Sequence, residues 1–185
     1  NAASVYIDDF EGTQNKIDLK DVNSWKLASI PVGYKGYDFG RNNLKSGYNR
    51  AKLSWYSIDP IFYSYKSPNE ISSDEVSKNS TRRIYVDEIF PELDLYQGES
   101  RSQTTFDLSF YPDEKGPYNN NTVDEFQSDK KNNWAAVTKS INTTNFKKAN
   151  VEYIQFWMLD DFEDYDSNEF EIGEIVFHLG NISED

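Results

Sequence analysis

Short apolar runs recur along the chain, and stretches rich in Gly, Pro, Asn and Asp separate them. The runs are rich in β-branched and aromatic residues, a composition that is typical of β-strands. They predict strands at residues 4–10, 24–30, 51–58, 82–90, 104–111, 135–144, 151–159 and 174–179.

Two of these runs differ in the faces that they are expected to bury. In residues 51–58, Leu53 and Trp55 alternate with Lys52 and Ser54, which predicts a strand with one buried face. In residues 151–159 apolar side chains occupy both faces, which predicts a central strand that is covered on each side.

Helical signals are weak, because no stretch carries a long apolar stripe at helical spacing. Short helices are expected at residues 72–79, where Ser or Asp could cap the first turn, and at 144–150. Many short strands with little helix predict an all-β fold, a jelly-roll β-sandwich with few short helices. No repeat or linker divides the chain, so residues 1–185 are predicted to form a single domain.

Composition narrows the classes of partner. The chain of 185 residues has 19 basic and 32 acidic residues, a net charge of −13, so binding to nucleic acid or to an anionic membrane surface is not expected. It has no Cys, which excludes disulfides, thiolate catalysis and zinc–thiolate sites. No apolar run is long enough to span a bilayer as a helix, and the abrupt ends suggest a domain excised from a much larger protein.

The densest acidic run, DDFEDYDSNE (160–169), has the oxygen ligands that calcium prefers. The calcium loop of helix–loop–helix proteins does not fit it. In the best alignment, Glu169 stands where that loop requires Gly, and Ile175 stands where it requires a bidentate Glu.

A calcium site of another geometry stays open. Jelly rolls place their first and last strands side by side, so Asp9 and Glu11 could share a structural calcium ion with Asp161. The simpler alternative is an acidic hairpin exposed to solvent. Calcium is the only cofactor that the residues suggest.

Catalytic signals are weaker still. Among 32 acidic residues some pair always suits glycosidase chemistry, so such a pair has no specificity. The only histidine, His178, is predicted to lie on a strand face, with neither a nucleophile nor an orienting partner indicated by the sequence. No enzymatic activity is therefore predicted.

Sugar binding would need an exposed aromatic platform. Trp55 and Trp157 lie inside apolar runs and are expected in the core, whereas Trp134 follows the polar stretch DKKNN. Trp134 is therefore the candidate ligand-binding residue, although an aromatic at the edge of a loop more often serves packing.

A set of ordered landmarks resembles a known family. The landmarks are YIDDFEG (6–12), WKLASIP (25–31), YNRAKLSWYSIDPIFY (48–63), VDEIFPE (86–92), DLSFYPDEKGPYN (107–119), NNWAAVTKSINTTNFKKANVEYIQFWMLD (132–160) and LGNISED (179–185). Together they resemble a segment of the SprA/Sov family, the very large outer-membrane translocon proteins of the type IX secretion system and gliding motility machinery of Bacteroidetes. They span nearly the whole chain.

The resemblance implies a location at the bacterial outer membrane or cell surface, and contacts with other translocon subunits and secreted substrate proteins. The runs are too short and the charge is too negative for the wall of a membrane barrel, so this domain is not expected to span the membrane. The opening DDFEG, followed by a Trp, is also similar to the first strand of carbohydrate-binding-module and galactose-binding jelly rolls.

Two functions follow as expectations. The first is a non-catalytic structural and interaction domain of the translocon, needed for protein transport and gliding motility. The second is a carbohydrate- or glycan-binding module of a cell-surface protein. Buried tryptophans would favour the first function, and a row of exposed coplanar aromatics over a groove would favour the second.

Overall fold

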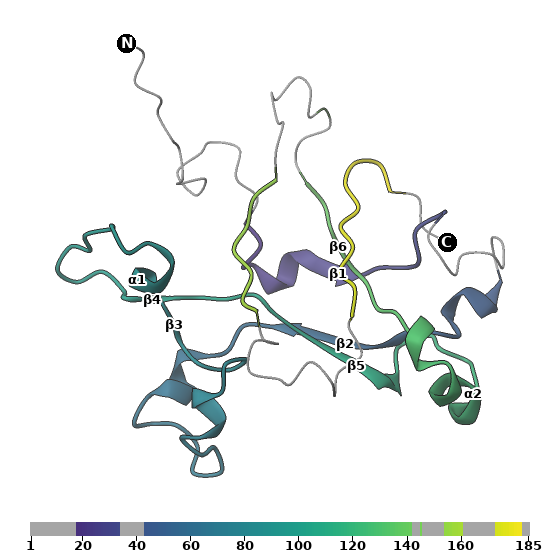
Figure 1. The fold of residues 1–185 in the computed structure, drawn as a ribbon, viewed down its shortest axis with the longest axis horizontal. Coiled ribbons are helices and arrows are strands. Elements are labelled where there is room, and N and C mark those ends of the chain that lie inside the picture. Colours follow the sequence, from purple (N-terminus) through teal and green to yellow (C-terminus); the bar gives the residue numbers. More distant parts are fainter. Residues whose placement is uncertain (1–17, 34–42, 142–144, 146–153, 161–172, 183–185) are drawn as a thin grey trace.

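Three antiparallel pairs of strands form the sheets in the part of the chain that the computed structural model describes (Figure 1). The described residues are 18–33, 43–141, 145, 154–160 and 173–182. The pairs are β1 (Trp25–Leu27) with β6 (Val137–Lys139), β2 (Ala51–Tyr56) with β5 (Asp107–Lys115), and β3 (Ile84–Tyr85) with β4 (Ser102–Gln103).

The β2–β5 pair is the longest and crosses the molecule in Figure 1. Leu53 lies opposite Phe110 and Trp55 opposite Leu108, so these four side chains share one face of the ribbon. Polar partners such as Ser54 and Ser109 lie on the other face. The strand predicted at residues 51–58 is therefore confirmed as β2. Its predicted buried face is not, because Leu53 and Trp55 are only half-buried and their partners Phe110 and Leu108 are 45% and 51% exposed.

Helical segments are short and lie between the strands. The two α-helices are α1 (Val86–Ile89) and α2 (Val123–Ser128). The 3-10 turns are η2 (Val22–Ser24), η3 (Leu44–Gly47), η4 (Pro60–Tyr63), η5 (Glu75–Ser77) and η6 (Lys130–Asn132). Within the described residues, none of the helices is long and apolar enough to cross a membrane.

Among the described residues, the buried apolar side chains come from β2, α1, α2 and the residues that follow β1; they are Ala28, Ile30, Ala51, Val86 and Phe126. Phe126 of α2 is fully buried, and Ile30 and Ala51 are almost fully buried. Thr122 begins α2 by accepting a hydrogen bond from the backbone N–H of Glu125 at 3.3 Å. The cap fixes the start of the helix, so that Phe126 on its second turn faces the core.

A close backbone contact joins the end of β5 to the start of β2. A Cβ atom on Gly116 would stand 2.2 Å from the carbonyl oxygen of Ala51, and the Gly116 N–H donates to the carbonyl of Arg50 at 2.9 Å. Asn119 donates to the carbonyls of Tyr48 and Arg50 at 3.0 and 2.7 Å. Glycine is therefore required here by space.

Several predicted elements differ from the structure. The strand expected at residues 82–90 ends at Tyr85, because the Glu88 carboxylate accepts the Tyr85 N–H at 2.9 Å and the chain turns into α1. The strand expected at 104–111 begins at Asp107 and continues to Lys115, whereas those at 24–30 and 135–144 are confirmed only as the short β1 and β6.

Two other predicted strands are not formed in the described residues. Residues 154–159 and 174–179 belong to no strand. The short helix predicted at 72–79 is confirmed as the single turn η5, with the Ser72 hydroxyl accepting the Glu75 N–H at 3.2 Å. The strand predicted at 4–10 and all but one residue of the helix predicted at 144–150 lie outside the described residues.

The fold class is thus confirmed at a coarse level. The described chain consists mainly of small β-sheets with few short helices, and its strands form separate two-stranded sheets rather than a sandwich. A sandwich needs strands that extend each sheet, and the two apolar segments suited to that position are not paired.

Candidate functional site

The predicted calcium ligands Asp9, Glu11 and Asp161 all lie outside the described residues. Within the described residues, no group of three or more His, Asp or Glu side chains could hold a metal ion. The calcium site therefore stays a prediction from the sequence.

Trp134 lies partly buried against Arg50. The Arg50 guanidinium is 5.0 Å from the centre of the Trp134 ring, and the Trp134 backbone bonds to Asn49 and Ala51 at 2.9 and 2.8 Å. The guanidinium covers one face of the indole, as expected for a cation–π contact. Trp134 therefore contributes to packing around Arg50, and a sugar could stack only on its other face.

Of the other tryptophans, Trp25 and Trp55 contact neighbouring segments, whereas Trp157 is exposed. Trp25 stacks on Phe106 with ring centres 5.0 Å apart, and its indole N–H donates to the Leu19 carbonyl at 3.0 Å. The Trp55 indole N–H donates to the Val22 carbonyl at 3.2 Å. Trp157, expected in the core, is 57% exposed. His178 is also exposed, on a segment that forms no strand.

A group of titratable side chains lies where β2 ends and β5 begins. The Asp107 carboxylate accepts the Thr105 hydroxyl at 3.0 and 3.2 Å, and burial raises the pKa of Asp107. Burial also raises the pKa of Tyr63, whose hydroxyl donates to the carbonyl of Thr81 while Arg83 lies 4.9 Å from its ring centre. Asp107 bonds to a neighbouring hydroxyl, and Tyr63 bonds to backbone and lies beside Arg83, which fits a structural role.

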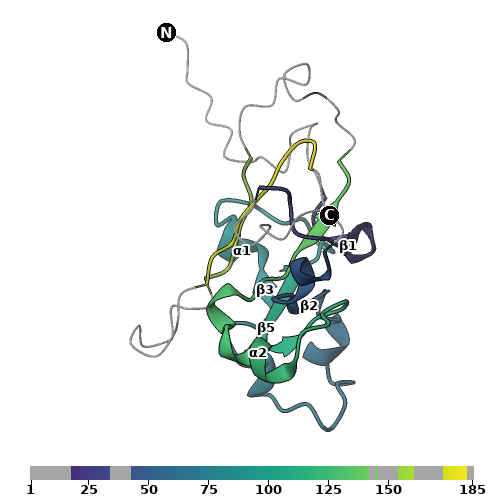
Figure 2. The ribbon, with the colours of Figure 1, turned by 90° about the vertical axis from the view of Figure 1, so that its right-hand side faces the viewer.

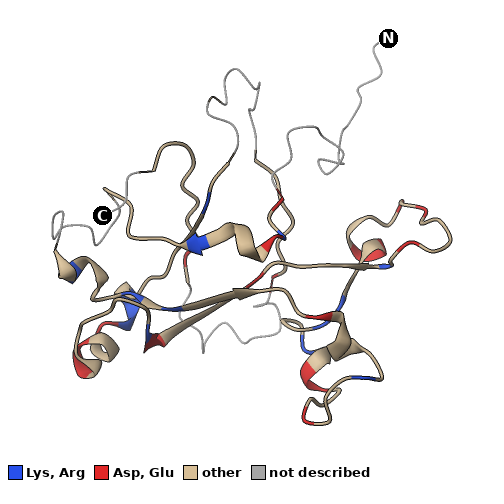
Figure 3. Cartoon of the chain, turned by 180° about the vertical axis from the view of Figure 1, so that it is seen from behind, with Lys and Arg blue, Asp and Glu red and all other residues tan. Residues whose placement is uncertain are grey.

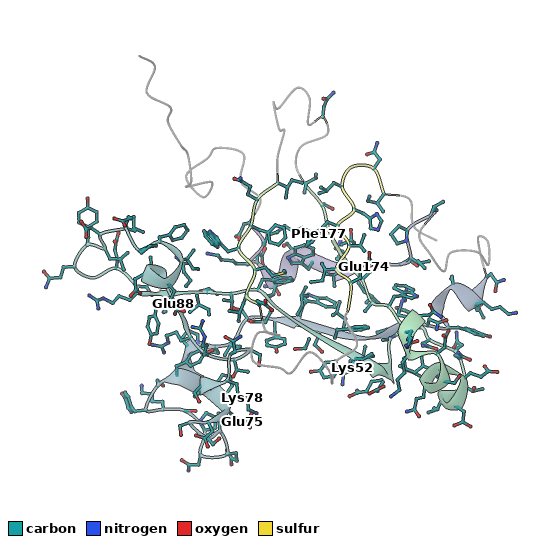
Figure 4. The ribbon with its side chains drawn as sticks, viewed as in Figure 1. Lys52, Glu75, Lys78, Glu88, Glu174 and Phe177 are labelled. Carbon is teal, nitrogen blue, oxygen red and sulfur yellow. The ribbon has the colours of Figure 1, made fainter. Side chains whose placement is uncertain are left out.

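Ion pairs lie on the surface (Figure 4). Lys52 contacts Glu114 at 2.6 Å, and this hydrogen bond raises the pKa of Lys52. Glu88 contacts Arg82 at 2.7 Å, and its bond from the Tyr85 N–H, together with Arg82, lowers the pKa of Glu88. Figure 3 shows acidic residues on loops and short helices at both ends of the molecule. Pairs exposed in this way contribute little stability.

Two of the hollows on the surface of the described residues can be compared with ligand pockets. One, of 430 Å³, is lined by a single continuous polar stretch, residues 127–132. The other, of 260 Å³, is lined by serines together with Phe62, Ile71 and Val76. Ligand pockets usually enclose roughly 300–1,000 Å³ and bring polar groups together from several elements. Neither hollow has both features.

The most distinctive surface is apolar. Residues 154–159 and 174–177 together form what is called here the apolar surface; Trp157, Met158, Ile175 and Phe177 are each 57–65% exposed. Both segments lie on the same side of the β2–β5 ribbon in Figures 1 and 2, and the Phe156 and Phe177 rings are 5.0 Å apart. Figure 4 labels Phe177 and Glu174 on the second segment.

The apolar side chains on both faces of residues 151–159 predict a strand that is buried on each side within the chain's own core. In the structure the described part of the segment is exposed. A surface of this kind is typical of protein–protein contacts, because monomeric proteins rarely expose large contiguous apolar patches.

No protein-family model and no curated protein matches this chain.

Proposed function

We propose that this chain is a non-catalytic structural and interaction domain of the outer-membrane translocon of type IX secretion, located at the outer membrane or cell surface. The observation that carries the proposal is the apolar surface, whose side chains are exposed as in proteins that dock other proteins. The ordered sequence landmarks support the choice of translocon. Other translocon subunits and secreted substrate proteins are the proposed partners.

The proposed complete fold is a jelly-roll β-sandwich. The three antiparallel pairs support this proposal, because a jelly roll is built from antiparallel strands. A sandwich of this kind would provide a rigid support for the exposed surface.

Crosslinking in the intact outer-membrane complex tests the function. A photo-crosslinking residue at Met158, which is 65% exposed, should give products that contain another translocon subunit or a secreted protein. The same residue at Leu44, 69% exposed on η3, is the matched control and should give few products. Products at neither position, with the protein present at its normal level, would contradict the proposal.

A glycan-binding function is the alternative, and it has less support. Trp134, its sequence candidate, has one ring face covered by Arg50. Glycan-array binding by the 185-residue chain that disappears in Trp134→Ala would favour this alternative over the translocon domain.

A further inference from the structure

We propose that Tyr118 is a sugar-binding residue, whose exposed ring stacks on a hexose unit of a neutral oligosaccharide. The observation that carries this inference is a strained backbone under an exposed aromatic side chain. The inference goes beyond the proposed docking function. The two sites use different residues, so each can hold or fail alone.

The backbone of Tyr118 adopts a conformation that a bulky side chain disfavours. Its φ is 61°, and among the described residues it is the only one other than Gly with a positive φ. The Asn119 N–H closes a turn here by donating to the Gly116 carbonyl at 3.3 Å. Pro117 followed by a positive φ is typical of a type II turn, where the position of Tyr118 favours Gly or Asn. Strained residues of this kind cluster at ligand sites.

Contacts of the neighbouring residues hold the turn in place, near α2 in Figure 1. The Arg50 guanidinium donates to the Pro117 carbonyl at 3.3 Å, and the Gly116 N–H donates to the Arg50 carbonyl at 2.9 Å. The Asn119 side-chain amide adds bonds to the carbonyls of Tyr48 and Arg50. None of these bonds uses the Tyr118 side chain, so the fold maintains the strain without help from the Tyr118 hydroxyl.

The side chain of Tyr118 is 79% exposed, so its ring contributes little to packing. The Arg50 guanidinium is 5.9 Å from the centre of the Tyr118 ring, at the outer limit of a cation–π contact, and 5.0 Å from that of Trp134. Two aromatic rings therefore flank Arg50, and that of Tyr118 extends into solvent. An exposed ring on a fixed backbone loses little freedom when a ligand stacks on it.

The surroundings of the ring indicate a neutral sugar. The Asn49 side chain donates to the Asp129 carboxylate at 2.9 Å and to the Asn133 amide oxygen at 3.2 Å, and Asn120, next to Tyr118, is exposed. Amides both donate and accept hydrogen bonds, as sugar hydroxyls do, and an aromatic ring can cover the apolar face of a hexose. Amides around one ring suit a hydroxyl-rich ligand better than the apolar centre of a protein interface. The net charge of −13 disfavours an acidic glycan.

Titration of the 185-residue chain with tetrasaccharides of glucose, mannose or galactose, followed by NMR, tests the inference. At least one of them should bind and shift the ring proton signals of Tyr118. A galacturonate oligosaccharide of the same length, with a carboxylate on each unit, is the matched control. It should bind about tenfold more weakly than the neutral sugar.

Substitutions at Tyr118 separate binding from stability. Tyr118→Asn should weaken binding about tenfold and melt no lower than the wild type, because Asn lacks the ring and tolerates a positive φ. Tyr118→Phe keeps the ring and should retain most of the binding. Tyr96→Asn, the same change at a position that is 81% exposed, should leave binding unchanged. Circular dichroism confirms that each variant is folded.

Four results would overturn the inference. They are no binding of any of the three neutral tetrasaccharides, binding that Tyr118→Asn leaves unchanged, a Tyr118→Asn variant that melts below the wild type, and a complex with another protein that depends on Tyr118 without sugar binding. The third would show that the ring serves packing on Arg50, and the fourth that a protein is the ligand. Crosslinks from Met158 to a translocon subunit, without sugar binding, would refute this inference and leave the proposed function intact.

Discussion

The guanidinium of Arg50 donates hydrogen bonds to the carbonyls of Ala28 and Pro117 and to the Ser29 hydroxyl, each at 3.3 Å. Its side chain is 7% exposed and lies beside the Trp134 ring. Arg50 therefore joins segments that are far apart in the sequence. A single Arg in a polar stretch is usually read as a surface residue, and this one is buried only because three segments converge on it.

Arg50→Lys should destabilise the fold by about 2 kcal/mol, because Lys keeps the charge but lacks the planar fork that serves several acceptors at once. Urea denaturation measures the change. Arg101→Lys, at an exposed position, is the control and should change stability by less than about 0.5 kcal/mol. Equal stability of Arg50→Lys and the wild type would mean that these hydrogen bonds contribute nothing.

Gly116→Ala should destabilise the protein by about 1–3 kcal/mol, because the added Cβ would stand 2.2 Å from the Ala51 carbonyl and force backbone to move. Gly173→Ala is the matched control, since a Cβ at that position meets no atom within 4 Å. Thermal unfolding of both variants checks the prediction, and similar melting temperatures would contradict it.

The raised pKa of Asp107 predicts that the stability of the fold depends on pH. Burial raises its pKa above the ordinary value of 3.8, so the folded protein holds this proton to a higher pH than the unfolded chain does. The stabilisation that this bound proton gives the folded state is fully present below pH 3.8. It is lost as the pH rises through the raised pKa of Asp107.

Asp107→Asn has no such titration, so the wild type should lose stability relative to this variant as pH rises across that range. Urea denaturation at a series of pH values measures the difference. Asp94→Asn, at an exposed position, controls for the change in net charge. A stability difference between wild type and Asp107→Asn that is constant with pH would refute the prediction.

At the scale of elements, the residues of the first turn stabilise the short helices. The chain of α2 has Asp124 and Glu125 in its first turn, where carboxylates suit the positive end of a helix, and its Thr122 cap precedes them. The pattern of residues along the chain does not predict α2, because a helix of six residues shows too little periodicity to be recognised. The signal that could have found it is the four-residue pattern T-x-x-E, Thr122 to Glu125, that opens the helix.

Thr122→Ala should destabilise the protein by about 1 kcal/mol, since it removes the acceptor for the Glu125 N–H. Thr122→Ser keeps a hydroxyl at that position and should retain most of the stability. The two variants are compared by urea denaturation. A loss in Thr122→Ser as large as in Thr122→Ala would assign the effect to the Thr methyl group instead of the cap.

At the scale of the whole molecule, the acidic charge and the apolar surface have opposite effects. A net charge of −13 keeps copies of the chain apart, whereas exposed apolar side chains favour association with a partner. The same charge also repels within each copy.

Thermal stability should therefore rise with salt. Screening of self-repulsion between low salt and about 0.15 M NaCl should stabilise the fold by about 1 kcal/mol, which raises the melting temperature by about 2–4 °C. Weakening of the exposed ion pairs acts in the opposite direction but is smaller. KCl should act like NaCl, and a neutral osmolyte at equal osmolality provides the control. A fall in melting temperature with salt would show that the ion pairs dominate.

The sequence by itself determined the features that arise from near neighbours. Alternation in residues 51–58 predicted β2, and the composition of the runs predicted a mainly β chain with few short helices. Such features depend on backbone geometry and on side chains a few residues apart, so a local pattern is sufficient. The failure at residues 82–90 has a local cause as well, since Glu88 bonds to the Tyr85 N–H and ends the strand.

Only the tertiary structure decided what depends on distant contacts. Burial of Arg50, the close approach of Gly116 to Ala51 and the covering of Trp134 all arise where separate segments meet. The burial of residues 154–159 is also decided by distant contacts. Their apolar side chains predict burial, but the sequence does not show what they pack against. The physical reason is that burial depends on which surfaces come together in space, whereas hydrophobicity belongs to each residue alone.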